Sequence, residues 1–477
     1  MKKNDNLPEV EPVELKPILS MRPGLFIFLS AIVIVLLILF GLFLLPGLIG
    51  STCYVTFESN VANVAIYDGG KYLGSTEGSV YEFDPGMHNL SFYIDGIDAG
   101  ELQYNAKKHY FFTLFHRNVD TVDIEIKNTE AIEDKVIDVF TSSISSWSMV
   151  LDYSETYHFP PLYSEFAHNA SALGFSDIED AWLYGAMHVT SKTLYDDYIN
   201  GLEILKNSNV KYNSKELETL NKQLDIIYNK NSNTLIAATK SNDAVTAVKN
   251  DSFFHYDATT IIMGEERKLV YPDLNTAPIE VSIDAFEISA TPVSEYEFAL
   301  FVNENPMWAK SNKDELITKG LVDENYLEGI TLSTDIKAKK PIRNISWYAA
   351  KAYTEWLSSK EGTLYNLPQE SEWTVAALSS KDKPYATSLL AIDKDNTSPS
   401  FMLGQLWEFT DTSYIPLARI TSYGKALELS RMFEDEEIIV KGGSYVNNSS
   451  SINEHTVGVM NKSTCSEYAG FRVVRYE

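Results

Sequence analysis

Cysteine and histidine are the residue types here best suited to metal binding or nucleophilic catalysis, and both are sparse. The 477 residues include eight histidines and two cysteines, Cys53 and Cys465, for which a disulfide and two free thiols are both open. His158, His168 and His188 lie ten and twenty residues apart, whereas two imidazoles need an i, i+4 spacing to share one helical face. No Gly-x-Ser-x-Gly segment is present. The sequence therefore predicts neither a histidine-based metal site nor a serine or cysteine hydrolase.

The last half of the chain instead carries five short blocks that combine Trp, Gly or Pro with charged residues. In chain order they are Pro341-Ile342-Arg343-Asn344-Ile345-Ser346-Trp347, Tyr365-Asn366-Leu367-Pro368-Gln369-Glu370-Ser371-Glu372-Trp373, Met402-Leu403-Gly404-Gln405-Leu406-Trp407-Glu408-Phe409-Thr410-Asp411, Lys441-Gly442-Gly443-Ser444-Tyr445 and Gly470-Phe471-Arg472. One such block would carry little information, because these residues are common in compact domains. Five blocks in a fixed order are specific enough to indicate a family.

This ordered set resembles the formylglycine-generating enzyme family, also called sulfatase-modifying-factor domains, from about Thr260 to the C-terminus. The resemblance implies an α+β domain of C-type-lectin-like fold, with much irregular backbone around a small sheet. It also implies an activity, because family members convert a cysteine of a client sulfatase to formylglycine with oxygen and copper. Two cysteine thiolates hold the copper, since soft Cu(I) favours thiolate ligands.

The resemblance also locates the two copper positions in this chain. In the family, the first cysteine stands two residues after the aromatic residue of the Gly-Gly-Ser motif and the second stands five further on. Counted from Tyr445, these positions are Asn447 and Ile452. A neutral amide and an aliphatic side chain cannot replace two thiolates. Copper is therefore not expected, no other resident cofactor is expected, and the domain is predicted to have lost the oxidase activity.

Other residues around these positions could still line a pocket. The predicted lining comprises Ser444, Asn447, Trp407, Glu408, His455 and Cys465. An alternative function is an oxidoreductase of the same family with a non-standard site that uses Cys465 and His455. Calcium is possible because it takes several oxygen ligands. Its weak candidate ligands are Asp393, Asp395, Asn396 and Glu408.

Several residues of the blocks are better suited to structural roles. Arg472 is expected to pair with Glu372 or Glu408 inside the domain. Two helices are predicted, over Pro341 to Trp356 and over Pro368 to Leu378. The tryptophans are large apolar side chains with one donor each, suited to a core with many loops. They are Trp347, Trp356, Trp373 and Trp407.

A membrane-spanning helix is predicted near the N-terminus. Residues 24–50 contain no charged side chain, and this length exceeds the apolar core of a signal peptide. Lysines and one arginine precede the segment, whereas the first cation after it is Lys71. The positive-inside rule then makes residues 1–23 a cytoplasmic tail. The following domains are expected outside the cytoplasm, in a bacterial periplasm or on the cell surface.

Residues 51–128 alternate apolar and polar side chains with period two, which predicts a small antiparallel β-sandwich. Turn signals stand at Asp68-Gly69-Gly70, Asp84-Pro85-Gly86 and Asp95-Gly96. The segments Val55 to Asn60, Ala65 to Gly69 and Pro85 to His88 resemble a PEGA domain, a short surface-associated β module. The resemblance departs at Asn60-Val61-Ala62-Asn63, where a turn that contains proline is usual.

Residues 129–252 show helical periodicity and are predicted to form a helical spacer. One apolar stripe comprises Leu194, Tyr198, Leu202 and Leu205, and a second comprises Leu217, Leu220, Leu224 and Ile227. Such stripes usually face a core. Ser214 is well placed to cap the second helix.

The charge of the chain limits its partners. Asp and Glu outnumber Lys and Arg 66 to 39, a formal charge of -27, which repels nucleic-acid phosphates. We therefore expect a multidomain, single-pass membrane protein without nucleic-acid partners, in which residues 253–477 form the formylglycine-generating-enzyme-like domain. Its expected role is to bind a protein or another cell-envelope molecule. A purely structural envelope spacer is a further possibility, which the PEGA-like module favours.

Overall fold

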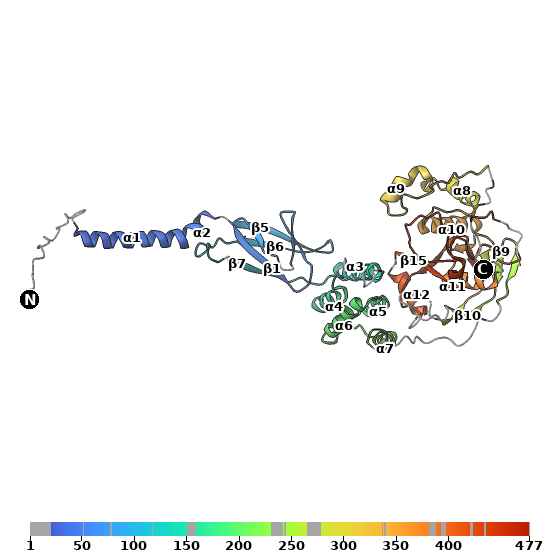
Figure 1. The fold of residues 1–477 in the computed structure, drawn as a ribbon, viewed down its shortest axis with the longest axis horizontal. Coiled ribbons are helices and arrows are strands. Elements are labelled where there is room, and N and C mark those ends of the chain that lie inside the picture. The colour runs from blue at the N-terminus through green and yellow to red at the C-terminus, as the bar shows by residue number, and fades with distance from the viewer. Residues whose placement is uncertain are drawn as a thin grey trace, which may run out of the picture. The chain divides into compact units, whose positions relative to one another are not determined.

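The computed structural model describes residues 21–476 except 51, 77–78, 117, 150–158, 230–241, 243–244, 265–277, 336, 338–339, 381–387, 393–396, 420–422 and 434–435. Most of the predicted cytoplasmic tail, together with Asp393, Asp395 and Asn396, lies outside the described residues. The chain divides into two compact units, Met1–Ile132 and Glu133–Glu477 (Figure 1).

The first unit begins with an apolar helix, α1 (Pro23–Phe43), followed by the short α2 (Leu45–Ile49). By length and composition α1 can cross a membrane, and none of its side chains is buried. Pro23 stands in its first turn, where the missing N–H costs nothing. A rise of about 1.5 Å per residue gives it a length of about 31 Å, close to the hydrocarbon thickness of a bilayer.

The described residues of the same unit then form a series of strands. They are β1 Cys53–Ser59, β2 Ala65–Asp68, β3 Lys71–Ser75, β4 Tyr81–Phe83, β5 Gly86–Ile94, β6 Ile97–Ala106 and β7 Val119–Ile124. One sheet has the order β4-β1-β7 and the other β3-β2-β5-β6. The strand β1 pairs with β7 in parallel, whereas the other pairs are antiparallel. A period-two pattern cannot distinguish the two directions, because side chains alternate in both.

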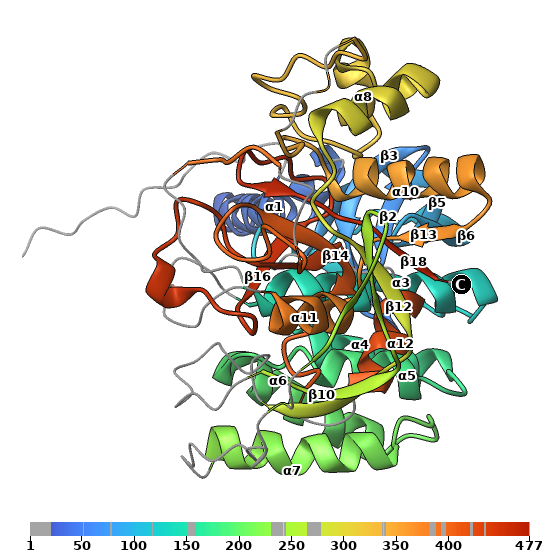
Figure 2. The same cartoon turned by 90° about the vertical axis from the view of Figure 1, so that its right-hand side faces the viewer.

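Helices follow in the described residues: α3 Glu130–Ser148, whose first turn precedes the boundary at Glu133, and then α4 Leu162–Leu173, α5 Glu179–Ala186, α6 Lys192–Lys206 and α7 Lys215–Asn229 in the second unit (Figures 1 and 2). The predicted apolar stripe on α6 is confirmed, since Leu194, Tyr198, Leu202 and Leu205 are all buried. The predicted cap of α7 is also confirmed, because the Ser214 hydroxyl accepts a hydrogen bond of 3.2 Å from the Leu217 amide.

The rest of the second unit mixes short strands with helices and irregular backbone. Its strands form three sheets, with the orders β10-β11, β13-β18-β12-β9-β8 and β16-β15-β14-β17. Their bounds are β8 Val248–Asn250, β9 Phe253–Tyr256, β10 Thr259–Met263, β11 Ile279–Ile283, β12 Phe286–Ser289, β13 Leu364–Asn366, β14 Trp407–Ser413, β15 Glu437–Lys441, β16 Val457–Asn461, β17 Ala469–Gly470 and β18 Val474–Tyr476. The α-helices are α8 Glu295–Glu304, α9 Lys313–Thr318, α10 Trp347–Glu361, α11 Glu370–Ser379 and α12 Tyr423–Met432.

Both predicted helices of this domain exist, but each begins later than predicted. The first, α10, begins at Trp347, where the Ser346 hydroxyl accepts a 3.1 Å hydrogen bond from the Ala349 amide. Pro341 lies before it, in a bridge to Ser294. Pro341 therefore lies in the extended segment that precedes α10, and not in the first turn of the helix.

Candidate functional site

The loop after β15 contains Asn447, the first of the two positions that the resemblance predicts for copper ligands. Asn447 faces back toward the Gly-Gly-Ser motif, where its Oδ1 accepts hydrogen bonds from the Ser444 amide at 2.8 Å and the Ser444 hydroxyl at 2.9 Å. Ser444 itself is buried. The asparagine thus ties the loop together, a role common for short polar side chains in turns.

Ile452, at the second copper position, belongs to the hydrophobic core. It is 6% exposed and packs in a cluster that includes Trp373, Met402 and Val474. A Cβ added to Gly443 would lie 2.5 Å from its Cδ1 atom, so the isoleucine fills the space directly against the motif. Gly443 also has a φ of +67°, which favours glycine. Neither copper position offers a thiolate, and one of them is filled by a packed aliphatic side chain.

Cys465 is a buried free thiol, and so is Cys53. Cys465 packs in a second cluster with Tyr326, Ala469 and Phe471, and its backbone amide donates to Asp323 at 3.0 Å. Burial is the main cause that raises the pKa of the Cys465 thiol. These surroundings disfavour the thiolate that nucleophilic or metal chemistry needs.

The remaining residues of the predicted pocket have other surroundings. Trp407 and Glu408 are the first two residues of β14, and Glu408 pairs within its sheet with Lys441 of β15 and Gly470 of β17. His455 is partly buried in the loop before β16, where its amide donates to Asn453 at 3.0 Å. Among the six residues of the predicted pocket, the structure therefore joins Ser444 to Asn447 by hydrogen bonds, whereas Trp407, Glu408, His455 and Cys465 have the separate surroundings described above.

Glu408 is committed to the core of the domain. Its Oε2 accepts hydrogen bonds from the Trp373 indole at 2.7 Å and from Arg472 Nε at 2.5 Å, and its Oε1 accepts from Arg472 Nη2 at 2.8 Å. All three side chains are fully buried. Of the two glutamates predicted as partners of Arg472, the structure therefore pairs Arg472 with Glu408. A carboxylate that already accepts three hydrogen bonds is a poor calcium ligand. Among the described residues, no group of three or more His, Cys, Asp or Glu side chains is placed to hold a metal ion.

A second buried ion cluster lies at the start of α11. The Glu370 carboxylate pairs with Arg419, accepts a 2.8 Å hydrogen bond from the Tyr423 hydroxyl and lies 3.7 Å from Lys441 Nζ. Burial lowers the pKa of Lys441 to about 8, and Arg419 acts in the same direction. Sequence reasoning missed this cluster because Arg419 and Lys441 lie far from Glu370 in the chain.

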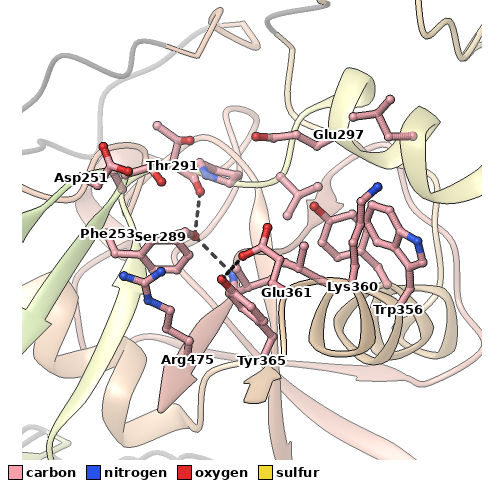
Figure 3. Close-up of a pocket in the computed structure, with 18 residues that line it drawn as sticks. Asp251, Phe253, Ser289, Thr291, Glu297, Trp356, Lys360, Glu361, Tyr365 and Arg475 are labelled. Carbon is pink, nitrogen blue, oxygen red and sulfur yellow. Dashed lines mark hydrogen bonds between the residues drawn. The ribbon is translucent and has the colours of Figure 1, made fainter. Parts of the chain in front are cut away.

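A cavity of about 400 Å³ opens elsewhere in the domain, between the β13-β18-β12-β9-β8 sheet and the helices α8 and α10 (Figure 3). Its aromatic lining is contributed by Phe253, Tyr353, Trp356 and Tyr365. This volume is within the range of pockets that hold small ligands or single side chains. None of the six residues of the predicted pocket lines it.

Carboxylates outnumber cations among the charged residues around this cavity. Three carboxylates line it, from Asp251, Glu297 and Glu361, together with Lys360 and Arg475. Both cations already have carboxylate partners outside the lining, because Lys360 Nζ lies 2.5 Å from Glu304 and Arg475 Nε lies 2.5 Å from Glu287. Aromatic faces next to carboxylates attract cations, and two of these faces are already covered by cations of the chain itself, Trp356 by Lys360 at 4.6 Å and Phe253 by Arg475.

The polar groups of the cavity are held in place by their neighbours. The Tyr365 hydroxyl donates to Glu361 at 2.5 Å, and the Arg475 guanidinium lies 4.1 Å from the centre of the Phe253 ring (Figure 3). Burial raises the pKa of Tyr365, and so does the Glu361 carboxylate that accepts its hydrogen bond. Sequence reasoning missed this cavity, because its lining comes from six separate segments and includes only Tyr365 from the five blocks.

Comparisons with known proteins agree with the sequence motifs. A family described as "Sulfatase-modifying factor enzyme 1-like domain" matches residues 244–401, a segment that ends before Asn447 and Ile452. An uncharacterised protein of Borreliella burgdorferi is 26% identical over 418 residues, which cover 78% of this chain and 79% of the relative.

Three solved structures are also similar. PvdO from Pseudomonas aeruginosa (15% identity, TM-score 0.33) and Treponema denticola variable protein 1 (15%, 0.32) each match over 50% of this chain and 100% of their own length. CarF (17%, 0.30) matches over 47% of this chain and 98% of its own length. By the family match alone, residues 244–401 of this chain form a sulfatase-modifying factor enzyme 1-like domain, in agreement with the family that the sequence blocks resemble.

Proposed function

We propose that this protein is a membrane-anchored, extracytoplasmic binding or scaffold protein whose formylglycine-generating-enzyme-like domain has lost copper-dependent oxidase activity. One observation carries the proposal: Asn447 holds the Ser444 turn and Ile452 fills the core at the two copper positions. Oxidation of a cysteine by this family's route needs two thiolates that hold Cu(I). Neither Asn447 nor Ile452 can supply a thiolate.

The binding role is supported by the cavity of Figure 3. Its aromatic walls and three carboxylates favour a partner that presents a lysine, an arginine or another cation. The membrane anchor is supported by α1, which is apolar along its whole length. The expected partner is a protein or another molecule of the cell envelope.

The alternative is an oxidoreductase with a non-standard site at Cys465 and His455. The burial of Cys465 counts against it, because a raised thiol pKa leaves little thiolate at neutral pH. The structural spacer is a third function, and it differs from the binding role in requiring no defined partner.

A copper titration tests the loss of oxidase activity. The full chain in detergent should not compete with a Cu(I) chelator or oxidise a cysteine-containing peptide with oxygen uptake. Asn447→Cys together with Ile452→Cys should bind Cu(I). The control, Val446→Cys with Ser449→Cys, adds two thiols to the same loop at neighbouring positions that are not the copper positions, and it should bind less. Tight Cu(I) binding and peptide oxidation by the native chain would refute the proposal.

Photo-crosslinking in cells tests the binding role. A photoreactive amino acid at Trp356, in the cavity, should give one defined adduct, and the same group at the exposed Ile317 on α9 should not. Glu361→Gln should weaken the Trp356 adduct, because it removes negative charge from the lining. Cell-wall or self adducts at both positions would instead favour the spacer.

A further inference from the structure

A loop of the β module exposes an unusual number of large apolar side chains. Residues 110–115, hereafter the aromatic loop, connect β6 to β7. Five of its six side chains are large, apolar and 47% to 63% exposed. They are Tyr110, Phe111, Phe112, Leu114 and Phe115. Apolar clusters of this kind on a protein surface usually mark an interaction site.

The aromatic loop is attached to the end of the apolar helix α1. The Phe112 amide donates to the Phe43 carbonyl oxygen at 2.9 Å. The Phe43 ring lies 4.9 Å from the Phe112 ring and 5.5 Å from the Phe115 ring, measured between centroids. Phe112 adopts a φ of +63°, which is costly for an aromatic residue. The loop is therefore held at the level of the last residue of α1.

The short helix α2 fixes the other side of the loop. Gly47 is buried against the Tyr110 backbone, where an added Cβ would lie 2.1 Å from the carbonyl oxygen. Lys108 Nζ donates to the Leu48 carbonyl oxygen at 2.9 Å. Leu48 and Ile49 are themselves exposed, so their side chains add to the apolar surface of the loop.

The level of this surface relative to α1 indicates what covers it. Because α1 is about as long as the hydrocarbon core is thick, Phe43 would lie at the boundary between lipid tails and headgroups. Aromatic side chains are enriched at that depth. The sequence places cations on both sides of the loop, with Lys107 and Lys108 before it and Arg117 after it. Cations in such positions favour anionic lipid headgroups.

We propose that the aromatic loop, with Leu48 and Ile49, inserts into the interfacial layer of the bilayer that α1 crosses, on the side where the chain leaves it. The inference rests on the proposed membrane span. It gives the β module a second attachment, which restricts tilting of the module about the end of α1. The partner is the lipid surface, and the five exposed side chains supply the contact.

Spin-label depth measurements on the full chain in phosphatidylcholine and phosphatidylglycerol nanodiscs test this proposal. Both native cysteines are buried, so labels can be directed to Phe111→Cys and Phe115→Cys. A label at Leu36→Cys, in the middle of α1, reports the span. A label at Asp98→Cys is the aqueous control, since Asp98 is exposed at the far end of β6, roughly 27 Å along the strand from its last residue.

The proposal predicts that the ratio of oxygen to nickel-chelate accessibility at Phe111 and Phe115 is several-fold above that at Asp98. The ratio should be highest at Leu36. A ratio at both loop positions equal to that at Asp98, with Leu36 in lipid, would overturn the insertion while leaving the span intact. Protection from both reagents with spin coupling between chains would overturn it in favour of a dimer. A ratio at Leu36 as low as that at Asp98 would show that α1 does not cross the bilayer, and it would overturn the inference as well.

Discussion

At the scale of single residues, three buried glutamates of the C-terminal domain show how different partners give one side chain different properties. Glu408 is held by Arg472, and Glu370 by Arg419. Glu372 instead accepts hydrogen bonds from the Gln369 amide at 2.7 Å and from the Tyr476 hydroxyl at 3.0 Å. Burial raises the pKa of the Glu372 carboxyl to about 7, whereas the cations lower the pKa of Glu370 against its burial.

Glu372→Gln should change how stability depends on pH. The folded-state pKa of about 7 lies above the ordinary value of 4.5, so Glu372 stabilises the fold below pH 4.5 and this contribution is lost as pH rises through 7. Between pH 4.5 and pH 7 the free energy of unfolding that Glu372 contributes falls by at most about 3 kcal/mol. The free energy of unfolding of the variant, measured with urea, should therefore rise relative to that of the native chain between pH 4.5 and pH 8.

The matched control for this prediction is Glu355→Gln, which alters an exposed glutamate on α10. Its difference from the native chain should stay constant over the same pH range. A constant difference for Glu372→Gln as well would show that the buried carboxyl does not take up a proton in the folded domain.

Sequence reasoning reached some of these residues and not others for a physical reason. The pairing of Arg472 with a glutamate was predictable because both belong to recognisable blocks. Arg419 belongs to none, and its contact with Glu370 spans 49 residues of chain. Such a contact exists only once the fold has formed. The same applies to the cavity of Figure 3, whose lining includes Phe253 from β9 and Arg475 from β18.

At the scale of elements, helix positions were more predictable than helix boundaries. The stripes of α6 and α7 were found because a period of 3.6 residues is a property of the local sequence. The start of α10 depends on which polar residue caps it, and several candidates precede Trp347. Ser346 takes that role because its hydroxyl reaches the Ala349 amide.

Ser346→Ala should destabilise the domain by about 1 kcal/mol, the usual cost of losing an N-cap side chain. Ser359→Ala, on the exposed side near the end of the same helix, should change stability much less. Thermal unfolding of both variants measures the difference. Equal melting temperatures for the two variants would show that α10 does not depend on this cap.

At the scale of the whole molecule, the second unit joins its helical segment to the family domain through α5 and α12. The Tyr184 and Phe433 rings pack with centroids 5.0 Å apart. Beside them Lys425 Nζ lies 2.8 Å from Asp180, and the Leu417 amide donates to the Met187 carbonyl oxygen at 3.0 Å. Tyr184 is fully buried, whereas the charged pair is partly exposed. The aromatic contact should therefore contribute more than the ion pair.

Phe433→Ala should loosen α5 and α12 together, at a cost of about 2 kcal/mol for a half-buried ring and its aromatic contact. Lys425→Ala should cost less than about 1 kcal/mol, because exposed ion pairs contribute little. Hydrogen exchange of the full chain, read by mass spectrometry, should show faster exchange in both helices for Phe433→Ala and little change for Lys425→Ala. Faster exchange in α12 alone would mean that the helical segment keeps its structure without this contact, so that the two parts of the unit are stable independently.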